Sequence, residues 1–394
     1  MRGFPVVTSI QPGMMFLNIQ FALSLCTILI TILLLKQKYS LFKLISIGCL
    51  MFITAGLKFY AGAMLIGYLG LVSLFNFISQ KNSKEFIFTL LASTTGLLLS
   101  YFLFYRVPGS VTIPFSYAPF ALVHLMIEDP LLFYNHSLTL ARYYLYGHSL
   151  GFSLRLWGIE IYSIILLLMM NFGTRIFGLI SAFFQSLKFK LNSEETAFFV
   201  LIIISILIPV FFVQEGGWYN TMQFMYYGVF FASFLSYKPL SHLLSSKRKV
   251  FVVLGVVWIL LTLPNHFDQI RYLTAEQQVI ISSELEAFEF LSGLPQGAVY
   301  QSGVEKENAY IPALAGQQSY FVDLDQLMVT HVDYAARQEL IKNPLATLKD
   351  KTFSYVYLNH NHHNAPLILE ALEKNPDFRL VFENDTAMIY QRLP

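Results

Sequence analysis

Two adjacent carboxylates are the sequence feature with the clearest capacity for chemistry. Glu128 and Asp129 stand directly before Pro130, in a long segment that otherwise carries few charges. A carboxylate pair of this kind can take a proton as a general base, or it can bind a divalent cation, which prefers hard oxygen ligands. The alternative interpretation of the same residues is a solvated turn before a proline.

Other charged side chains occur inside or beside apolar runs, where hydrocarbon makes a charge costly. Lys58 follows the second apolar run, and Arg155 and Glu160 lie in the first turns of the fifth. We regard each as a candidate functional group, with Glu160 the deepest of the three. For Lys58 and Arg155, the alternative is that their side chains only extend to the lipid headgroups.

A third set of candidates surrounds two glycines between the sixth and seventh apolar runs. Residues 214–227 combine Trp218, an apolar ring with one donor, with neutral polar side chains and tyrosines. Stacking on an aromatic ring and uncharged hydrogen bonds are what a sugar ring requires. The side chains predicted to contact a sugar are Trp218, Asn220, Gln223 and Tyr226. Anchoring of these aromatic residues at the membrane interface is the alternative.

Three histidines within four residues raise the question of a metal site. His360, His362 and His363 follow a predicted strand, at the end where α/β folds bind ligands. Zinc needs further ligands and supporting groups around them, and both cysteines, Cys26 and Cys49, lie far away in apolar runs. We predict a solvated loop here and no metal site. The cofactor stays open, with a divalent cation at the acidic residues as the one candidate.

The composition indicates a membrane protein. Hydrophobic residues make up 55% of the 394 positions and charged residues 13%, against about a quarter charged in ordinary soluble proteins. Residues 268–394 hold 17 acidic and 9 basic side chains, so their net charge is −8. Because the whole chain has a net charge of +2, residues 1–267 carry a net charge of +10. A cationic membrane domain is therefore expected to precede an acidic soluble domain. No basic stripe or motif for nucleic acid is present.

Eight apolar runs separated by polar or charged residues predict membrane spans. The last, Val250–Leu263, lies between a basic cluster and a change to water-soluble composition. The earlier runs cover about Met14–Leu35, Leu41–Leu57, Tyr60–Ile78, Phe86–Tyr105, Leu154–Phe172, Ala197–Val213 and Phe224–Ser236. We therefore predict a polytopic α-helical membrane domain of about eight spans over residues 1–266, followed by a small α/β soluble domain over residues 267–394.

Lysine and arginine predict the orientation, because cytoplasmic loops are enriched in them. They collect in one set of alternate loops, so we expect those loops inside a bacterial inner membrane and both the amino terminus and the soluble domain outside. The long outer loop at 106–153 has short apolar stretches and tyrosines around Arg142, typical of interfacial or re-entrant helices. Such a surface can receive a lipid-linked ligand sideways, or it can serve only as an aromatic belt.

Beyond residue 267 the pattern alternates between helix and strand. Strands are predicted at 298–302, 319–323, 354–358, 378–383 and 387–391, and helices at about 274–291, 307–314, 326–342 and 366–374. Asn384-Asp385 is a suitable tight turn between the last two strands. The predicted domain is a mostly parallel α/β sheet closed by a terminal hairpin.

Several short segments carry a family resemblance. They are Gly56–Tyr60, Trp218–Tyr227, Tyr310–Gly316, Val381–Asn384 and Ile389–Tyr390. Together they resemble bacterial polytopic glycosyltransferases of the GT-C type, over the later spans and the tail domain. The resemblance implies transfer of a sugar, with inversion, from a polyprenyl-phosphate donor at the outer face of the membrane. Membrane lipids and a polyprenyl-phosphate-linked sugar are then the expected partners.

One feature of that family is missing from its usual place. The family carries an essential acidic residue in the first outer loop, whereas no Asp or Glu precedes Glu85 in this sequence. We expect either the later part of a longer or split enzyme, with its upstream half as a partner, or a non-catalytic relative. The second alternative is a multi-pass membrane protein that presents an extracytoplasmic binding domain.

The resemblance also implies roles for the candidate side chains. Glu128 or Asp129 would take the proton of the acceptor, and Glu160 would orient a cation. Cations placed where negative charge develops would stabilise the departing lipid phosphate. The side chains expected to do so are Lys58, Arg142 and Arg155.

Overall fold

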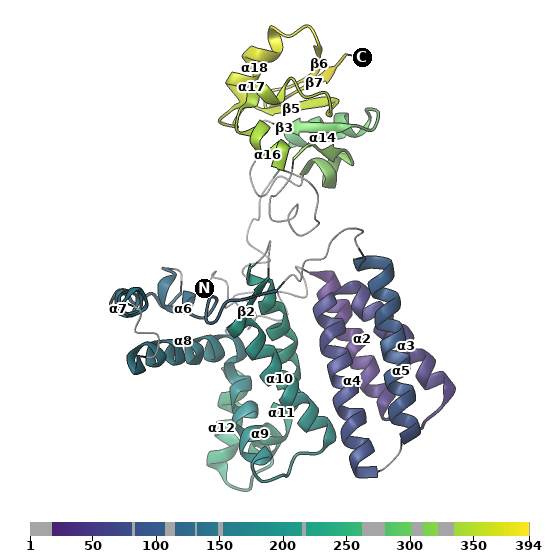
Figure 1. The fold of residues 1–394 in the computed structure, drawn as a ribbon, viewed down its shortest axis with the longest axis vertical. Coiled ribbons are helices and arrows are strands. Elements are labelled where there is room, and N and C mark those ends of the chain that lie inside the picture. Colours follow the sequence, from purple (N-terminus) through teal and green to yellow (C-terminus); the bar gives the residue numbers. More distant parts are fainter. Residues whose placement is uncertain are drawn as a thin grey trace. The chain divides into compact units, whose positions relative to one another are not determined.

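The computed structural model describes residues 18–80, 83–106, 115–130, 132–148, 153–214, 218–261, 280–301, 310–321 and 335–393. These residues form two compact units (Figure 1), one helical and one containing a five-stranded sheet. The predicted domain boundary at residues 266 and 267 lies outside the described residues, and so do the first residues of the first predicted span.

Each predicted apolar run contains a helix. The first four are α2 (Ile19–Leu35), α3 (Leu41–Leu57), α4 (Phe59–Gln80) and α5 (Ser83–Ser100), which a π-helical turn, η2 (Tyr101–Tyr105), extends. The later ones are α8 (Leu154–Phe172), α10 (Ser193–Phe211), α11 (Met222–Leu244) and α12 (Lys249–Leu260). A further helix, α9 (Ile176–Ser186), follows a 3₁₀ turn, η3 (Gly173–Arg175), in a stretch where no apolar run was predicted.

Local side chains define where several of these helices begin. Asn18 accepts a hydrogen bond from the amide of Phe21 before α2, and Ser40 accepts one from the amide of Lys43 before α3. Asn192 and Glu195 form a reciprocal capping box at the start of α10. Each cap satisfies an amide that has no partner within the helix.

Four helices in the described part of the chain are long and apolar enough to cross a membrane: Phe59–Ile78, Lys84–Tyr105, Leu154–Ser186 and Ser193–Phe211. The helices α2, α3 and α12 are apolar but shorter. The structure thus supports a helical membrane domain with four candidate spans, and a count of about eight spans does not follow from it.

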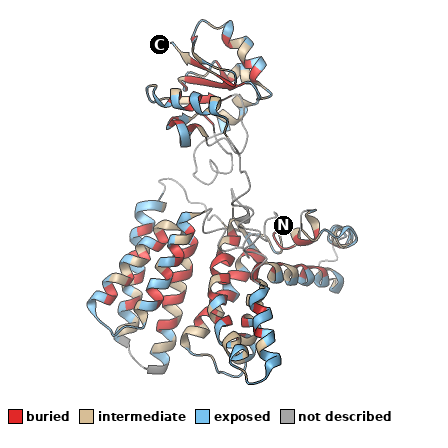
Figure 2. Ribbon diagram, turned by 180° about the vertical axis from the view of Figure 1, so that it is seen from behind, coloured by how far each residue is buried: buried red, intermediate tan, exposed pale blue. Residues whose placement is uncertain are grey.

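Helix α8 runs crosswise to α10 and α11 in both Figure 1 and Figure 2. The chain turns out of α8 at Gly173, whose φ of +51° lies in the left-handed region that glycine tolerates. Because α8 and α10 differ in direction, they cannot both run along one membrane normal. The predicted fifth span, Leu154–Phe172, is therefore a helix, but one that does not run alongside the others.

The sheet-containing unit has five strands in the order β4-β3-β5-β7-β6. They are β3 (Ala298–Gln301), β4 (Gln318–Ser319), β5 (Tyr355–Asn359), β6 (Phe378–Glu383) and β7 (Ala387–Arg392). The predicted hairpin is β6–β7, but β7 lies between β6 and β5. Two pairings are parallel and two antiparallel, so the sheet is mixed and not mostly parallel.

Both faces of this sheet are covered, and Figure 2 shows the buried strands between the helices. Tyr355 and Tyr357 of β5 face a core with Phe288 of α14 (Ser282–Ser292), while Val356 faces one with Ile368 of α18 (Ala365–Glu373). This alternation follows from the two-residue period of a strand. The smaller elements are η5 (Ile311–Ala315), α16 (Ala335–Ile341) and α17 (Pro344–Thr347).

Close packing between α10 and α11 depends on Gly228. A Cβ built there would collide with the hydroxyl of Ser205 and lie 2.9 Å from its Cβ. We expect Gly228→Ala to lower the free energy of unfolding by about 1–3 kcal/mol, because overpacking forces helices apart. Denaturation in mixed micelles measures this. Gly158→Ala on α8 is the control: nothing lies within 4 Å of its Cβ, so an equal loss there would contradict the packing argument.

Candidate functional site

The long predicted outer loop is tied to the end of α10. Strand β1 (Phe115–Tyr117) pairs antiparallel with β2 (Phe212–Gln214), directly after α10. The pairing continues as the amide of Ala118 donates to the carbonyl of Phe211 at 2.9 Å. Two helices follow, α6 (Leu125–Glu128) and α7 (His136–Gly147). The loop therefore brings its charged side chains to a defined place beside α8.

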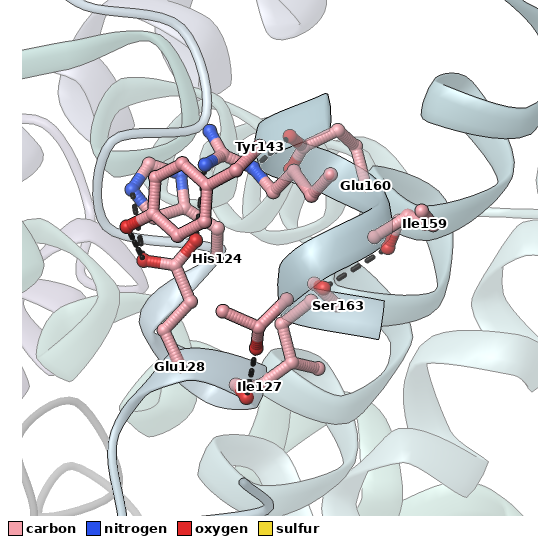
Figure 3. Close-up of polar contacts among 9 residues, drawn as sticks. His124, Ile127, Glu128, Tyr143, Ile159, Glu160 and Ser163 are labelled. Atoms are coloured by element: carbon pink, nitrogen blue, oxygen red, sulfur yellow. Dashed lines mark hydrogen bonds and ion pairs between the residues drawn. The ribbon is translucent and has the colours of Figure 1, made fainter. Parts of the chain in front are cut away.

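Arg142 joins three helices at this place; Figure 3 labels its two carboxylate partners, Glu128 and Glu160. Its Nη1 lies 3.0 Å from Oε1 of Glu128 on α6, and its Nε lies 2.7 Å from Oε1 of Glu160 on α8. All three side chains are largely buried. Hydrogen bonds between ionised groups are stronger than those between neutral groups, so these contacts fix the orientation of the three side chains. Three residues that the sequence singled out thus form one network.

The charge balance of the network bears on the role of Arg142. One guanidinium faces two carboxylates, so with all three ionised the network carries a net charge of −1. An approaching phosphate would be repelled by Glu128 and Glu160 more than it would be attracted by Arg142. The geometry favours Arg142 as the residue that orients the two carboxylates, and its predicted contact with a lipid phosphate stays a prediction.

Two further side chains surround Glu128 (Figure 3). The hydroxyl of Tyr143 donates to its Oε2 at 3.2 Å, and Nε2 of His124 lies 4.0 Å from the same oxygen. Burial and then the charge of Arg142 lower the pKa of His124 to about 4, although a backbone hydrogen bond at Phe120 opposes the shift. His124 is therefore neutral at pH 7, and its contact with Glu128 is not an ion pair there.

The second oxygen of Glu160 has no hydrogen-bond partner among the described residues. Glu160 is only 4% exposed, so this oxygen is buried as well as unpaired. Buried carboxylate oxygens without partners are uncommon, because no hydrogen bond offsets the free-energy cost of removing their bound water. The oxygen is placed to accept a hydrogen bond from a hydroxyl or to contact a cation.

A second group of predicted residues meets at the end of α3. Lys58 is the C-cap of α3, and its Nζ donates to Oε1 of Gln223, in the first turn of α11, at 3.4 Å. Nε2 of Gln223 in turn donates to Oδ1 of Asn220 at 3.2 Å, in the 3₁₀ turn η4 (Trp218–Thr221). The predicted phosphate-binding lysine and two predicted sugar-binding amides are therefore neighbours.

The remaining predicted residues lie apart from these contacts. Asp129 is the C-cap of α6 and half-buried, and Arg155 is exposed on α8. Tyr226 is 5% exposed and packs edge-on against Phe21 in the helical core. The side chain of Trp218 lies outside what the structure describes.

Sequence reasoning did not select His124 or Tyr143, although both positions carry a signal. His124 precedes Glu128 by four residues, which is one helical turn, and Tyr143 directly follows Arg142.

In the described ranges, no three His, Cys, Asp or Glu side chains gather closely enough to hold a metal ion. His360 and His363 are exposed in the loop after β5.

Removing Arg142 tests whether the network is a structural constraint. We expect Arg142→Gln to cost about 3–5 kcal/mol, because it leaves two buried carboxylates unpaired. The double variant Arg142→Gln/Glu160→Gln should recover part of that loss, since one unpaired charge is gone. Denaturation in mixed micelles measures both. Arg155→Gln, at an exposed position of α8, should change stability by under about 0.5 kcal/mol; a loss as large as that of Arg142→Gln would refute the network.

The pKa of His124 predicts a specific pH dependence. Between its ordinary value of 6.5 and its folded value of about 4, the unfolded chain binds more protons than the folded chain. Stability from this group is therefore complete above pH 6.5 and is lost as the pH falls toward 4. His124→Gln should flatten the fall in melting temperature over that window, whereas His360→Gln should leave it unchanged. A wild-type slope in His124→Gln would contradict the assignment.

Comparison with known proteins does not supply a function for this arrangement. No protein-family model matches the sequence, and no curated protein or solved structure is significantly similar to it. The function is therefore inferred from the chain's own residues.

Proposed function

We propose that the chain is a membrane glycosyltransferase-like protein that transfers a sugar from a polyprenyl-phosphate donor at the outer face of the membrane. The observation that carries the proposal is the Arg142 network, in which two buried carboxylates are held in fixed orientations and one keeps an unpaired oxygen. Carboxylates positioned by an arginine are suited to deprotonate a hydroxyl acceptor.

The roles follow from the contacts. Glu128, held by Arg142 and Tyr143, takes the proton of the acceptor hydroxyl as that oxygen attacks the anomeric carbon of the sugar. The bond from that carbon to the phosphate oxygen breaks on the opposite side, and its electron pair stays with the phosphate. Lys58 then stabilises the phosphate, because its neighbours in the described part of the chain, Gln223 and Asn220, are neutral.

Both polar groups border one short segment, Phe115–Phe120. The ring of Phe115 lies 6.4 Å from that of Phe224, directly after Gln223. The ring of Phe120 lies 5.6 Å from that of Trp157, on the same helix as Glu160. This shared border supports the idea that one substrate contacts both groups.

The surface beside the network suits a lipid-linked donor. Tyrosines on α7 and apolar residues on α8 are exposed there: Tyr143, Tyr144, Tyr146, Leu154, Trp157 and Ile161. Tyrosine and tryptophan favour the depth of the lipid headgroups. A polyprenyl chain can reach the carboxylates from the bilayer across such a surface.

Charge pairing supports the proposed orientation in a bacterial inner membrane with the sheet-containing unit outside. Lys36 pairs with Glu194, and Lys238 pairs with Glu195, at the start of α10. The candidate groups lie by β2, after the end of α10. The lysine-rich end is thus opposite the candidate site, as cytoplasmic enrichment in lysine requires.

A second candidate function rests on the sheet-containing unit. This unit has two hydrophobic cores of its own, one on each face of its sheet. A non-catalytic multi-pass protein that presents it as an extracytoplasmic binding domain would need no more than such a compact unit on a membrane anchor.

Turnover in proteoliposomes decides between the two functions. The full chain, alone and with the product of any adjacent upstream reading frame, is given a panel of polyprenyl-phosphate sugars, and released polyprenyl phosphate is measured. We expect Glu128→Gln to lower kcat by about 100-fold or more, because a general base is lost. Lys58→Met should lower it by about 100-fold or more through the lost charge.

Glu339→Gln is the matched control, because Glu339 is exposed on α16 in the other unit. It should retain wild-type turnover. Full activity in Glu128→Gln would reject the base assignment, and no turnover of any donor by folded wild-type protein would favour the binding-domain function.

A further inference from the structure

A second polar site lies at the lysine-rich end of the helical unit. A cavity of about 110 Å³, partly open to solvent, is lined there by residues of α2, α4, α5 and α10. It has room for a small ion with a few waters. Its lining residues are Leu35, Val72, Ser73, Asn76, Glu85, Phe86, Thr89 and Glu194.

Helical spacing brings oxygen-bearing side chains to this cavity. Ser73 and Asn76 are three apart on α4, and Glu85 and Thr89 are four apart on α5, so each pair shares one helix face. Glu194 adds a carboxylate from the first turn of α10. Hydroxyl, amide and carboxylate oxygens are ligands for hard cations, and the absence of sulfur or imidazole among the lining residues disfavours transition metals.

Two hydroxyls in the lining lack partners. Thr89 is 1% exposed and Ser73 is 8% exposed, yet among the described residues neither side chain makes a hydrogen bond. Buried hydroxyls normally find a partner, so these groups indicate that something else occupies the cavity.

Lys43 neutralises one of the two carboxylates. This lysine is 1% exposed, and its Nζ donates to the carbonyls of Leu35 at 3.0 Å and Gln37 at 2.9 Å and to Oε1 of Glu85 at 2.9 Å. All three ammonium protons are thus used within the protein. Lys43 therefore holds Glu85, one of the two carboxylates that line the cavity.

Glu194 is compensated more weakly. Its partner Lys36 lies 3.5 Å away, but the Lys36 side chain is 58% exposed, so water screens the pair. The cavity therefore retains about the negative charge of one carboxylate. A single positive charge balances it, whereas a divalent ion would leave the cavity with a net charge of about +1.

We propose that this cavity binds a monovalent hard cation, Na⁺ or K⁺, coordinated by Ser73, Asn76, Thr89 and Glu194. The ion ties α10 to α4 and α5 and is a structural ligand of the helical unit. This site is separate from the candidate sugar-transfer site, because it lies at the other end of α10.

Thermal melting with chosen salts tests the proposal on the full chain in detergent. Melting temperature is followed as NaCl, KCl or MgCl₂ replaces choline chloride at constant ionic strength. We expect a saturable rise with NaCl or KCl, about 3 °C when the ion is at 100 times its Kd. The ion with the lower midpoint identifies the occupant. Equal melting temperatures in all salts, or a saturable rise with MgCl₂ alone, would overturn it.

Side-chain variants locate the effect. Thr89→Val removes the hydroxyl at nearly constant volume and should abolish the rise. Ser93→Ala is the matched control on α5: its hydroxyl donates to the carbonyl of Thr89 at 2.8 Å and does not line the cavity, so the rise should persist. If Thr89→Val fails to fold, Ser73→Ala is used in the same comparison. A full rise in the folded hydroxyl variant would refute the site.

Discussion

A buried guanidinium between two carboxylates holds the candidate functional site together. Arg142 bonds to Glu128 on α6 and to Glu160 on α8, so one side chain on α7 fixes the three helices in one arrangement. Each of these charges is costly away from water and is tolerated only because the others are present. The same interdependence orients the carboxylates and leaves one oxygen of Glu160 available.

The two ends of the helical unit treat their lysines differently. At one end, Lys43 is buried, and its ammonium group donates three hydrogen bonds to protein acceptors, which makes it a structural cation. At the other end, the one side-chain partner that Lys58 has among the described residues is the neutral amide of Gln223, which does not balance its charge. Two lysines thus differ in what they can do. The number and charge of the acceptors around each ammonium group decide whether it is a structural cation or can bind an anion.

The helical unit has an apolar core, but its outer surface is largely apolar too, unlike that of a soluble protein. Apolar side chains such as Leu103 and Phe42 are exposed, while Ser24, Thr31 and Thr54 are buried between helices. Lipid provides no hydrophobic drive between helices, so small polar residues and close backbone contact assume that role. The sheet-containing unit also buries apolar side chains, with β5 buried on both faces of the sheet.

Local patterns in the sequence predicted most of the helices and strands, although α9 lies outside every predicted run. Apolar runs predict the other long helices, and the strand-like stretch at 354–358 predicts β5, because these signals act over a few residues. Only the tertiary structure decided what depends on distant contacts. It placed β7 between β5 and β6, turned α8 crosswise, and paired Glu160 with Arg142, although Arg155 is much closer to it in sequence. Such pairings depend on loop closure and packing across the whole unit, which no short sequence pattern encodes.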